Sequence, residues 1–291
     1  MYARVTIADW HTTLKTIGGI YPRWIFRGQP SARWGLETTL ERAAVAKNSA
    51  FASSADHLAV LINQAIAELP GREEWILHQF RRRAHLVMPS APPEDSLLDW
   101  LAAIQHFGGP TRLLDFTHSF YVAVFFALER ASEDAAVWGL YAPHLESRCG
   151  IGGDGDHVGT INERAVRLVE KALRGSIPCT GVVNVEPYRL NERMSVQKGV
   201  FALPLEITKP FMQSLSETFD FDFTEHDHQK YEMSVTEFLS FGLCRGPLVV
   251  KFVLPRIVHQ IALGDLAAMN IDASTLFPGL EGYARSMYRH F

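Results

Sequence analysis

The segment from Gln105 to Thr117 concentrates polar side chains between two apolar stretches. Apolar residues recur at helical spacing before it, so a helix should present Gln105 and His106 at its last turn. Gly108-Gly109-Pro110 then ends that helix, because glycine permits positive φ and proline restarts the chain in an extended direction. The pattern predicts a helix, a turn and a short strand over residues 111–117.

Period-2 alternation in that strand puts Thr111, Asp115 and Thr117 on one face. The stretch from Tyr121 to Leu128 is apolar all round and predicts a helix that is buried on most of its surface. The polar face of the strand should therefore lie beside the core, where polar groups need partners. These residues either bind a ligand or bind one another, for example through an Arg112–Asp115 pair.

A second candidate for ligand chemistry is Arg27, within Phe26-Arg27-Gly28-Gln29. The run Trp24-Ile25-Phe26 is typical of a strand, so Arg27 should sit at a strand end. An arginine beside a glycine that allows close backbone approach can anchor a phosphate or carboxylate through its planar guanidinium. A structural salt bridge is the alternative, and the sequence favours neither.

Several of these motifs occur together, in this order, in one known family. The chain resembles the FRG-domain family, which is named after its Phe-Arg-Gly motif, over roughly residues 20–205. The segments that carry the resemblance are Phe26-Arg27-Gly28-Gln29, Trp34-Gly35-Leu36, Gln105–Asp115, an apolar helix containing Phe126-Ala127, and Arg193–Phe201. Leu276-Phe277-Pro278 is also similar to the family.

The order of the expected elements resembles the ADP-ribosyltransferase fold, which is an α+β fold with a split β-sheet core. In that fold an arginine on the first strand holds a phosphate of NAD, a Ser or Thr motif precedes a buried helix, and a later glutamate orients the ribose. By this resemblance Arg27, the Thr111–Thr117 strand and Gln197 occupy the three positions. Gln197 departs from the pattern, because an amide stabilises a cationic sugar less well than a carboxylate does.

This resemblance implies a set of site residues. Gln197, Asp115 and His106 would be catalytic: Asp115 would supply the missing charge, and His106 would transfer protons near neutral pH. NAD would be the substrate or ligand, and no metal is expected. The residues expected to bind it are Arg27, Gly28, Gln29, Thr111, Arg112, Thr117, Tyr121 and Arg193.

The leading hypothesis is a nucleotide-binding, ADP-ribosyltransferase-like enzyme, either a transferase or an NAD glycohydrolase, with a toxin or an antiviral defence effector as its expected role. Its partners would be a nucleotide-like small molecule and a macromolecular acceptor or partner protein. The alternative is a catalytically silent module that binds a nucleotide or phosphorylated ligand and signals to a partner. A carboxylate in the Arg27 cleft would favour the enzyme. A nuclease would need a cluster of metal-binding carboxylates, and the sequence offers none that is convincing.

Composition limits the other classes of function. The chain has 291 residues, 47% of them hydrophobic, which is enough for a sizeable core. A net charge of −4 gives no general attraction to nucleic acid or to anionic membranes. The one dense basic run, Arg81-Arg82-Arg83, is more typical of a solvated helix face than of a nucleic-acid site. His226 and His228 lack a further spaced ligand for a metal.

Three cysteines, far apart and odd in number, argue against a disulfide framework and favour a reducing cytoplasm. No apolar run approaches the length needed to span a bilayer, so we expect a soluble protein with no membrane partner. The other expected helices are 6–17, 53–69, 72–88, 95–107, 163–174, a turn at 266–269 and a terminal helix from Gly279. The other expected strands are 136–141, 182–185, 200–203 and 248–254. Together they predict a single α+β domain over residues 1–291, with a helical insertion at about 40–107 and a C-terminal helical extension at about 255–291.

Overall fold

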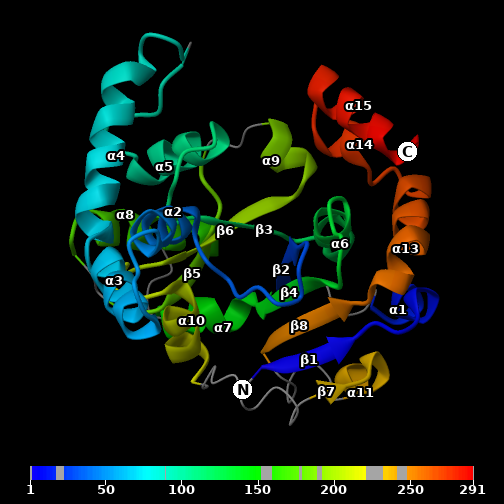
Figure 1. The fold of residues 1–291 in the computed structure, drawn as a ribbon. Coiled ribbons are helices and arrows are strands. Elements are labelled where there is room, and N and C mark those ends of the chain that lie inside the picture. The colour runs from blue at the N-terminus through cyan, green and yellow to red at the C-terminus, as the bar shows by residue number, and fades with distance from the viewer. Residues whose placement is uncertain are drawn as a thin grey trace.

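A computed structural model describes residues 2–17, 23–88, 90–151, 159–176, 179–188, 192–220, 232–240 and 248–290 (Figure 1). Its strands are β1 (Ala3–Thr6), β2 (Trp24–Gln29), β3 (Leu114–Thr117), β4 (Ala135–Tyr141), β5 (Val182–Val185), β6 (Gly199–Pro204), β7 (Glu232–Met233) and β8 (Val249–Leu254). Its helices before β5 are α1 (Trp10–Ile17), α2 (Thr39–Ser49), α3 (Ala55–Ala67), α4 (Leu69–Ala84), α5 (Leu97–His106), α6 (Phe120–Leu128), α7 (Ala142–Arg148) and α8 (Ile161–Leu173). Those after β5 are α9 (Glu192–Val196), α10 (Phe211–Phe219), α11 (Val235–Ser240), α13 (Arg256–Ala268), α14 (Ala273–Leu276), α15 (Leu280–Ser286) and the 3₁₀ helix η3 (Met287–His290).

The strands join in one sheet in the order β5-β6-β3-β2-β4-β8-β1-β7. β1 runs parallel to β7 and β8, and the other neighbours are antiparallel. All residues of β2 from Trp24 to Gln29 pair with β4, whereas β2 and β3 pair only at Phe26 and Thr117. The chain is therefore an α+β protein, as predicted, and its sheet is weakly joined between the two strands that carry the motifs.

Hydrophobic clusters cover both faces of this sheet. On one face, Phe26 and Val137 pack with the wholly apolar helix α6 and with α1, α13 and α14. On the other face, Ile25 and Trp138 pack with α7 and α10. Because each strand alternates between two buried faces, the central strands are apolar at nearly every position.

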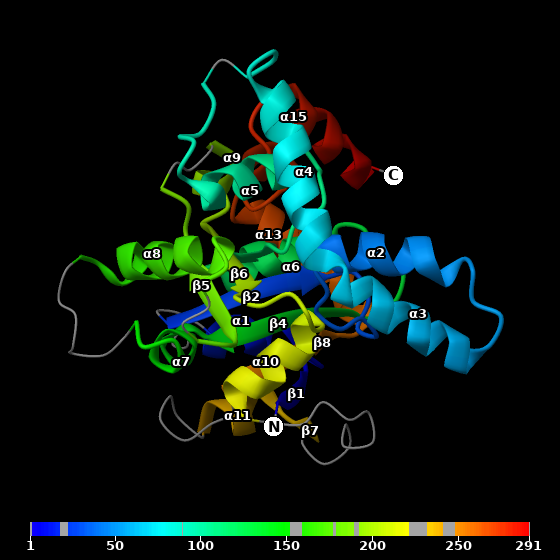
Figure 2. The same cartoon turned by 90° about the vertical axis from the view of Figure 1, so that its left-hand side faces the viewer.

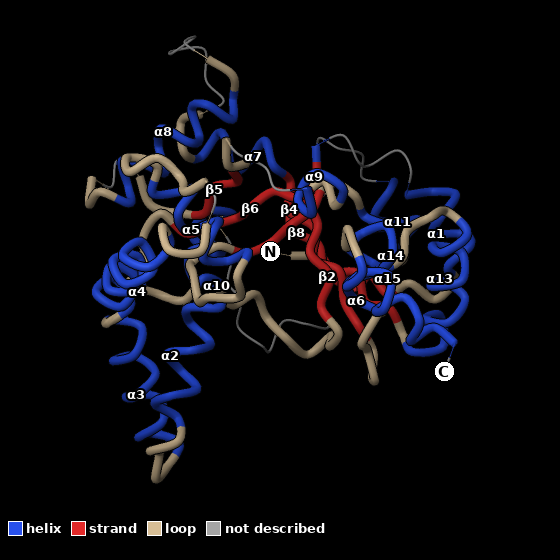
Figure 3. The backbone as a smooth tube through the Cα atoms, turned by 90° about the horizontal axis from the view of Figure 1, so that it is seen from above, coloured by secondary structure: helices blue, strands red, loops and turns tan. Residues whose placement is uncertain are grey.

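Two groups of helices lie on opposite sides of the molecule. Figures 1 and 3 place α2, α3 and α4 on one side and α13, α14 and α15 on the other. Figure 2 shows α2 and α3 as a pair of helices that projects from the body of the molecule. No helix among the described residues is long and apolar enough to cross a membrane.

Several elements differ from the sequence predictions. β1 occupies residues that we assigned partly to a helix starting at residue 6, and α1 begins only at Trp10. The predicted turn at 266–269 is the end of a much longer helix, α13. β3 starts at Leu114 because the backbone of Thr111 bonds to α2 instead: its N–H donates to Thr39 Oγ1 at 2.9 Å, and its carbonyl accepts from Leu40 N at 3.1 Å. His226 and His228 lie outside the described residues.

Candidate functional site

A cavity of about 300 Å³ is lined by residues of β2, β3, α5, α6, α9 and β6. The predicted site residues that line it are Arg27, Gly28, His106, Asp115, Thr117, Arg193 and Gln197. The predicted site residues that are not part of its wall are Gln29, Thr111, Arg112 and Tyr121. The structure thus gathers groups from residue 27 to residue 197 around one space.

Arg27 contributes a cation for which the described residues supply no ion pair. It lies inside β2, rather than at the strand end that the sequence predicted. Its Nη1 donates to the backbone oxygen of Asp115 at 2.7 Å, and its Nε is buried with no hydrogen-bond partner. Among the described residues Arg27 forms no ion pair. Burial lowers the pKa of Arg27, and the nearby Asp115 charge opposes this.

Asp115 is the one acidic residue in the described wall of the cavity. Its side chain is exposed, and its Oδ2 accepts a hydrogen bond from Gln105 Nε2 at 3.0 Å. Gln105 in turn accepts from Thr111 Oγ1 at 2.5 Å, so Thr111 acts through Gln105 to orient the carboxylate. The carboxylate that would favour an enzyme therefore lies in the same cavity as Arg27.

The turn after α5 fixes where Gln105 and His106 point. Gly108 has a φ of 80°, which favours glycine. Gly109 is required for a different reason: a Cβ there would lie 2.5 Å from Ile104 Cγ2. His106 is exposed beside the cavity, and its ring centroid lies 5.0 Å from that of Phe107.

Gly28 and Gln29 serve the packing of the fold. A Cβ on Gly28 would lie 2.0 Å from Ala123 O and 2.6 Å from Ala127 N, so the glycine lets β2 touch the backbone of α6. Gln29 is buried, accepts from Trp138 Nε1 at 3.0 Å and donates to Gly35 O at 2.8 Å. The Gln29 side chain therefore anchors the segment that carries the Trp-x-Leu motif.

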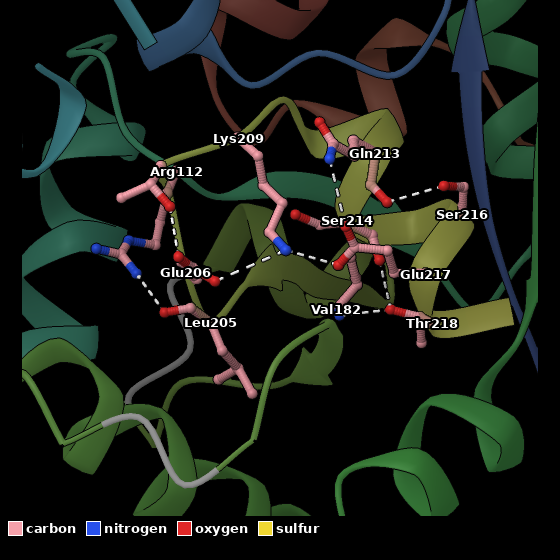
Figure 4. A network of polar contacts seen from close by, with 11 residues as sticks. Arg112, Val182, Leu205, Glu206, Lys209, Gln213, Ser214, Ser216, Glu217 and Thr218 are labelled. Carbon is pink, nitrogen blue, oxygen red and sulfur yellow. Dashed lines mark hydrogen bonds and ion pairs between the residues drawn. The ribbon is translucent and has the colours of Figure 1, made fainter. Parts of the chain in front are cut away.

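Arg112 forms a buried ion pair with Glu73 of α4, instead of the alternative pair with Asp115. Its Nε lies 2.8 and 2.9 Å from the two Glu73 carboxylate oxygens, and its Nη1 donates to Leu205 O at 3.2 Å. Figure 4 shows the bond to Leu205, with Lys209 bridging Glu206 and Glu217 nearby. Arg112 thus joins α4 to the end of β6.

Thr117 and Gln197 connect β3 to the segment after α9. Thr117 Oγ1 donates to Gln197 O at 2.7 Å. The Gln197 side chain donates from Nε2 to Leu276 O at 2.8 Å. No bond to Gln197 Oε1 is found among the described residues, so this oxygen is available to a ligand hydroxyl. Tyr121 is half-buried on α6 and packs against the core cluster beside Phe120.

Arg193 supplies a second cation to the cavity wall. It is exposed on α9, and its guanidinium carbon lies 4.4 Å from the centroid of the Phe277 ring.

Ala102, Phe126, Met194 and Phe201 are further wall residues that sequence reasoning missed. Helical spacing could have indicated Ala102, because it precedes His106 by four residues on the same face of α5. Phe126 and Phe201 gave no signal, since apolar residues in apolar elements indicate only burial.

No group of three or more His, Cys, Asp or Glu residues in the described parts of the chain could hold a metal ion. The family model of the FRG domain matches residues 22–136. This match confirms the family predicted from the motifs, and it includes Arg27 and Asp115 but ends before Arg193. No curated protein and no solved structure matches the chain.

Proposed function

We propose that the segment matching the FRG domain, residues 22–136, together with α9 and β6, binds a nucleotide of the NAD type in the cavity and cleaves its nicotinamide–ribose bond. The observation that carries the proposal is Arg27. Arg27 is half-buried, its Nε is buried without a hydrogen-bond partner, and a cation so placed is costly unless something supplies a negative charge. A phosphate in the cavity would do so.

The charge of the cavity wall supports an anionic ligand. Arg27 and Arg193 are both cationic, whereas Asp115 is the one carboxylate in the described wall. Arginine binds phosphate through parallel N–H donors, and a diphosphate offers oxygens to two arginines at once. The apolar side chains of Phe126 and Phe201 would suit the flat faces of a base or a nicotinamide ring.

Asp115 and His106 provide groups for the chemistry. When the bond between the nicotinamide nitrogen and ribose C1′ breaks, its electron pair leaves with nicotinamide and the sugar becomes cationic. The Asp115 carboxylate would stabilise that cation, as carboxylates do in glycoside hydrolysis. Water or an acceptor hydroxyl would then bond to C1′, and its proton would pass to His106 or Asp115.

We further propose that the sheet is of the ADP-ribosyltransferase type. Three features support this assignment: the sheet is weakly joined between β2 and β3, the apolar helix α6 follows β3 directly, and Gln197 precedes β6 at the position expected for the ribose-orienting residue. Fold likeness alone does not establish chemistry, so the activity needs its own test.

A second function, a catalytically silent nucleotide-binding module, is favoured by Gln197 itself. The residue in the position of the customary glutamate is an amide, and its Nε2 is bonded to Leu276 O at 2.8 Å. Such a side chain can hold a ribose hydroxyl through its oxygen without stabilising a cation. The two functions differ in whether nicotinamide is released.

The test measures ADP-ribose binding by calorimetry and nicotinamide release from NAD by mass spectrometry. Arg27→Ala should abolish binding. Asp115→Asn should retain most of the binding and lower nicotinamide release by about 10²-fold, because one transition-state charge is lost. Asp56→Asn, which changes an exposed carboxylate on α3, is the matched control and should alter neither.

Each outcome separates the two functions. Binding with nicotinamide release that depends on Asp115 supports the enzyme. Binding without release supports the silent module, and Gln197→Glu should then be tested for a gain of turnover. If wild-type protein binds neither NAD nor ADP-ribose, or if Arg27→Ala binds as wild type does, both functions are contradicted.

A further inference from the structure

The ring of Phe277, just after α14, lies within cation–π distance of two guanidinium groups. Its centroid is 4.4 Å from the guanidinium carbon of Arg193 and 3.9 Å from that of Arg285. The ring is buried, with 2% of its surface exposed. An aromatic face attracts a cation through its quadrupole, so the Phe277 ring attracts both Arg193 and Arg285.

Phe277 and the preceding residue, Leu276, contact two further residues of the cavity wall. The Phe277 ring packs edge-on against Phe126, with ring centroids 5.9 Å apart. The carbonyl of Leu276 accepts the hydrogen bond from Gln197 described above. Figures 1 and 3 show α14 beside α6 and α15. A segment near the C-terminus therefore contacts Phe126 of α6 and both Arg193 and Gln197 of the α9 segment, which form two different parts of the wall.

Arg285, the second cation near the Phe277 ring, is itself anchored to α6. Arg285 on α15 binds Glu129 at the end of α6 through both Nε and Nη2, and the two side chains are 20% and 16% exposed. Bidentate arginine–carboxylate pairs are among the better-defined polar contacts in proteins. The Phe277 ring is thus fixed relative to α6, the same helix against which Gly28 packs.

Arg193 has no other restraint of this kind. Its side chain is exposed, and among the described residues it forms no ion pair and no side-chain hydrogen bond. A free arginine samples many rotamers, and ordering it on binding costs free energy. Contact with a fixed aromatic ring removes part of that cost before a ligand arrives.

We propose that Phe277 is a positioning residue, which holds Arg193 in the wall of the cavity so that its guanidinium receives the diphosphate of a nucleotide ligand. This inference rests on the proposed function, because it presumes a phosphate-bearing ligand in the cavity. It adds a residue that lies more than 140 positions beyond the end of the matched FRG domain.

The experiment measures ADP-ribose binding by calorimetry for wild type, Arg193→Ala, Phe277→Leu and the double variant. Arg193→Ala should weaken binding about 10- to 100-fold, the usual effect of losing charge-assisted hydrogen bonds. Phe277→Leu, which keeps an apolar side chain but removes the π face, should weaken binding about 3- to 10-fold. The double variant should match Arg193→Ala alone, because Phe277 acts only through Arg193.

Two controls separate positioning from general damage. Phe277→Tyr keeps the aromatic face and should bind as wild type does. Phe125→Leu makes the same chemical change at a neighbouring core position that does not line the cavity, and it should leave binding unchanged. In the ligand-free protein, the Arg193 Hε signal in an NMR spectrum should be shifted by the Phe277 ring current and should lose that shift in Phe277→Leu.

The outcomes are distinguishable from those of the proposed function. If wild type binds ADP-ribose and Arg27→Ala does not, but Phe277→Leu binds as wild type does, the inference on Phe277 is overturned and the function stands. Equal weakening by Phe277→Leu and Phe125→Leu also overturns it. If Phe277→Leu fails to fold, Arg193→Ala binding as wild type overturns it instead. If wild type binds no ADP-ribose, the function fails and the inference fails with it.

Discussion

Arg27 and Arg112 lie close to the same strand, β3, but they differ in whether the fold supplies an ion pair for the guanidinium. Arg112 is paired with Glu73 and also bonded to a backbone carbonyl of Leu205. Arg27 has a single backbone bond to Asp115 and a buried Nε without a partner. Folding alone satisfies Arg112, whereas Arg27 is left with unused hydrogen-bonding capacity beside a cavity. The comparison shows that the same residue type serves the fold in one place and is open to a ligand in the other.

Lys251 on β8 is a third cation that can be compared with Arg27 and Arg112. It is a buried cation whose Nζ donates to Trp34 O at 3.0 Å and lies 4.8 Å from the centroid of the Trp138 ring. Burial lowers its pKa to about 8, and the nearby Arg4 charge adds to this effect. Lys251 does not line the candidate site. An uncompensated buried cation is therefore a signal for a ligand only where it also faces a cavity.

The largest expected effect is that of Arg112→Ala. It would leave Glu73 buried without its partner, and losing one member of a buried ion pair typically costs about 3–5 kcal/mol of unfolding free energy. Urea denaturation of the ligand-free protein measures this loss. Replacing both residues, in Arg112→Met with Glu73→Leu, should restore part of the stability. A loss below about 1 kcal/mol for Arg112→Ala would show that the pair does not hold α4 to the sheet.

A smaller effect is expected from Lys251→Met, and it depends on pH. Between pH 8 and the ordinary lysine pKa of 10.5, the folded protein has lost this proton while the unfolded chain still binds it. The unfolding free energy of the wild type should therefore rise with pH in this window relative to Lys251→Met, by up to about 1.4 kcal/mol per pH unit. Urea denaturation of both proteins at several pH values gives the difference. Parallel profiles would mean that Lys251 keeps its usual pKa.

The smallest effect on stability is expected from Arg27→Met in the ligand-free protein. The change removes an unneutralised cation together with one hydrogen bond, and these two contributions oppose each other. We expect the unfolding free energy to change by about 1 kcal/mol or less, measured beside Arg112→Ala under the same conditions. A loss as large as that of Arg112→Ala would make Arg27 a structural residue and would remove the contrast between them.

The sequence predicted those elements whose signals are local. The apolar run of α6 and the strands β4, β5 and β8 lie close to their expected positions, because their residue patterns are continuous. β1 was missed because its four residues form a strand only by pairing with β7 and β8, which lie more than 200 positions later. The ion pair between Arg112 and Glu73 was missed for a similar reason, because nothing in the sequence around either residue links the two. Arg27, Asp115 and Gln197 were grouped only through the family and fold resemblances.

The strand order determines how long a fragment of this protein must be to fold and form the site. The FRG match ends at residue 136, two residues into β4, yet β3 needs β6 and β4 needs β8 as neighbours in the sheet. A fragment limited to the match would carry Arg27 and Asp115 on strands with open edges, without α9 or Phe277. The segment that sequence comparison recognises is therefore smaller than the segment that can fold and form the site. Expression of the matched part alone would discard the part of the cavity wall that Arg193, Met194, Gln197 and Phe201 form.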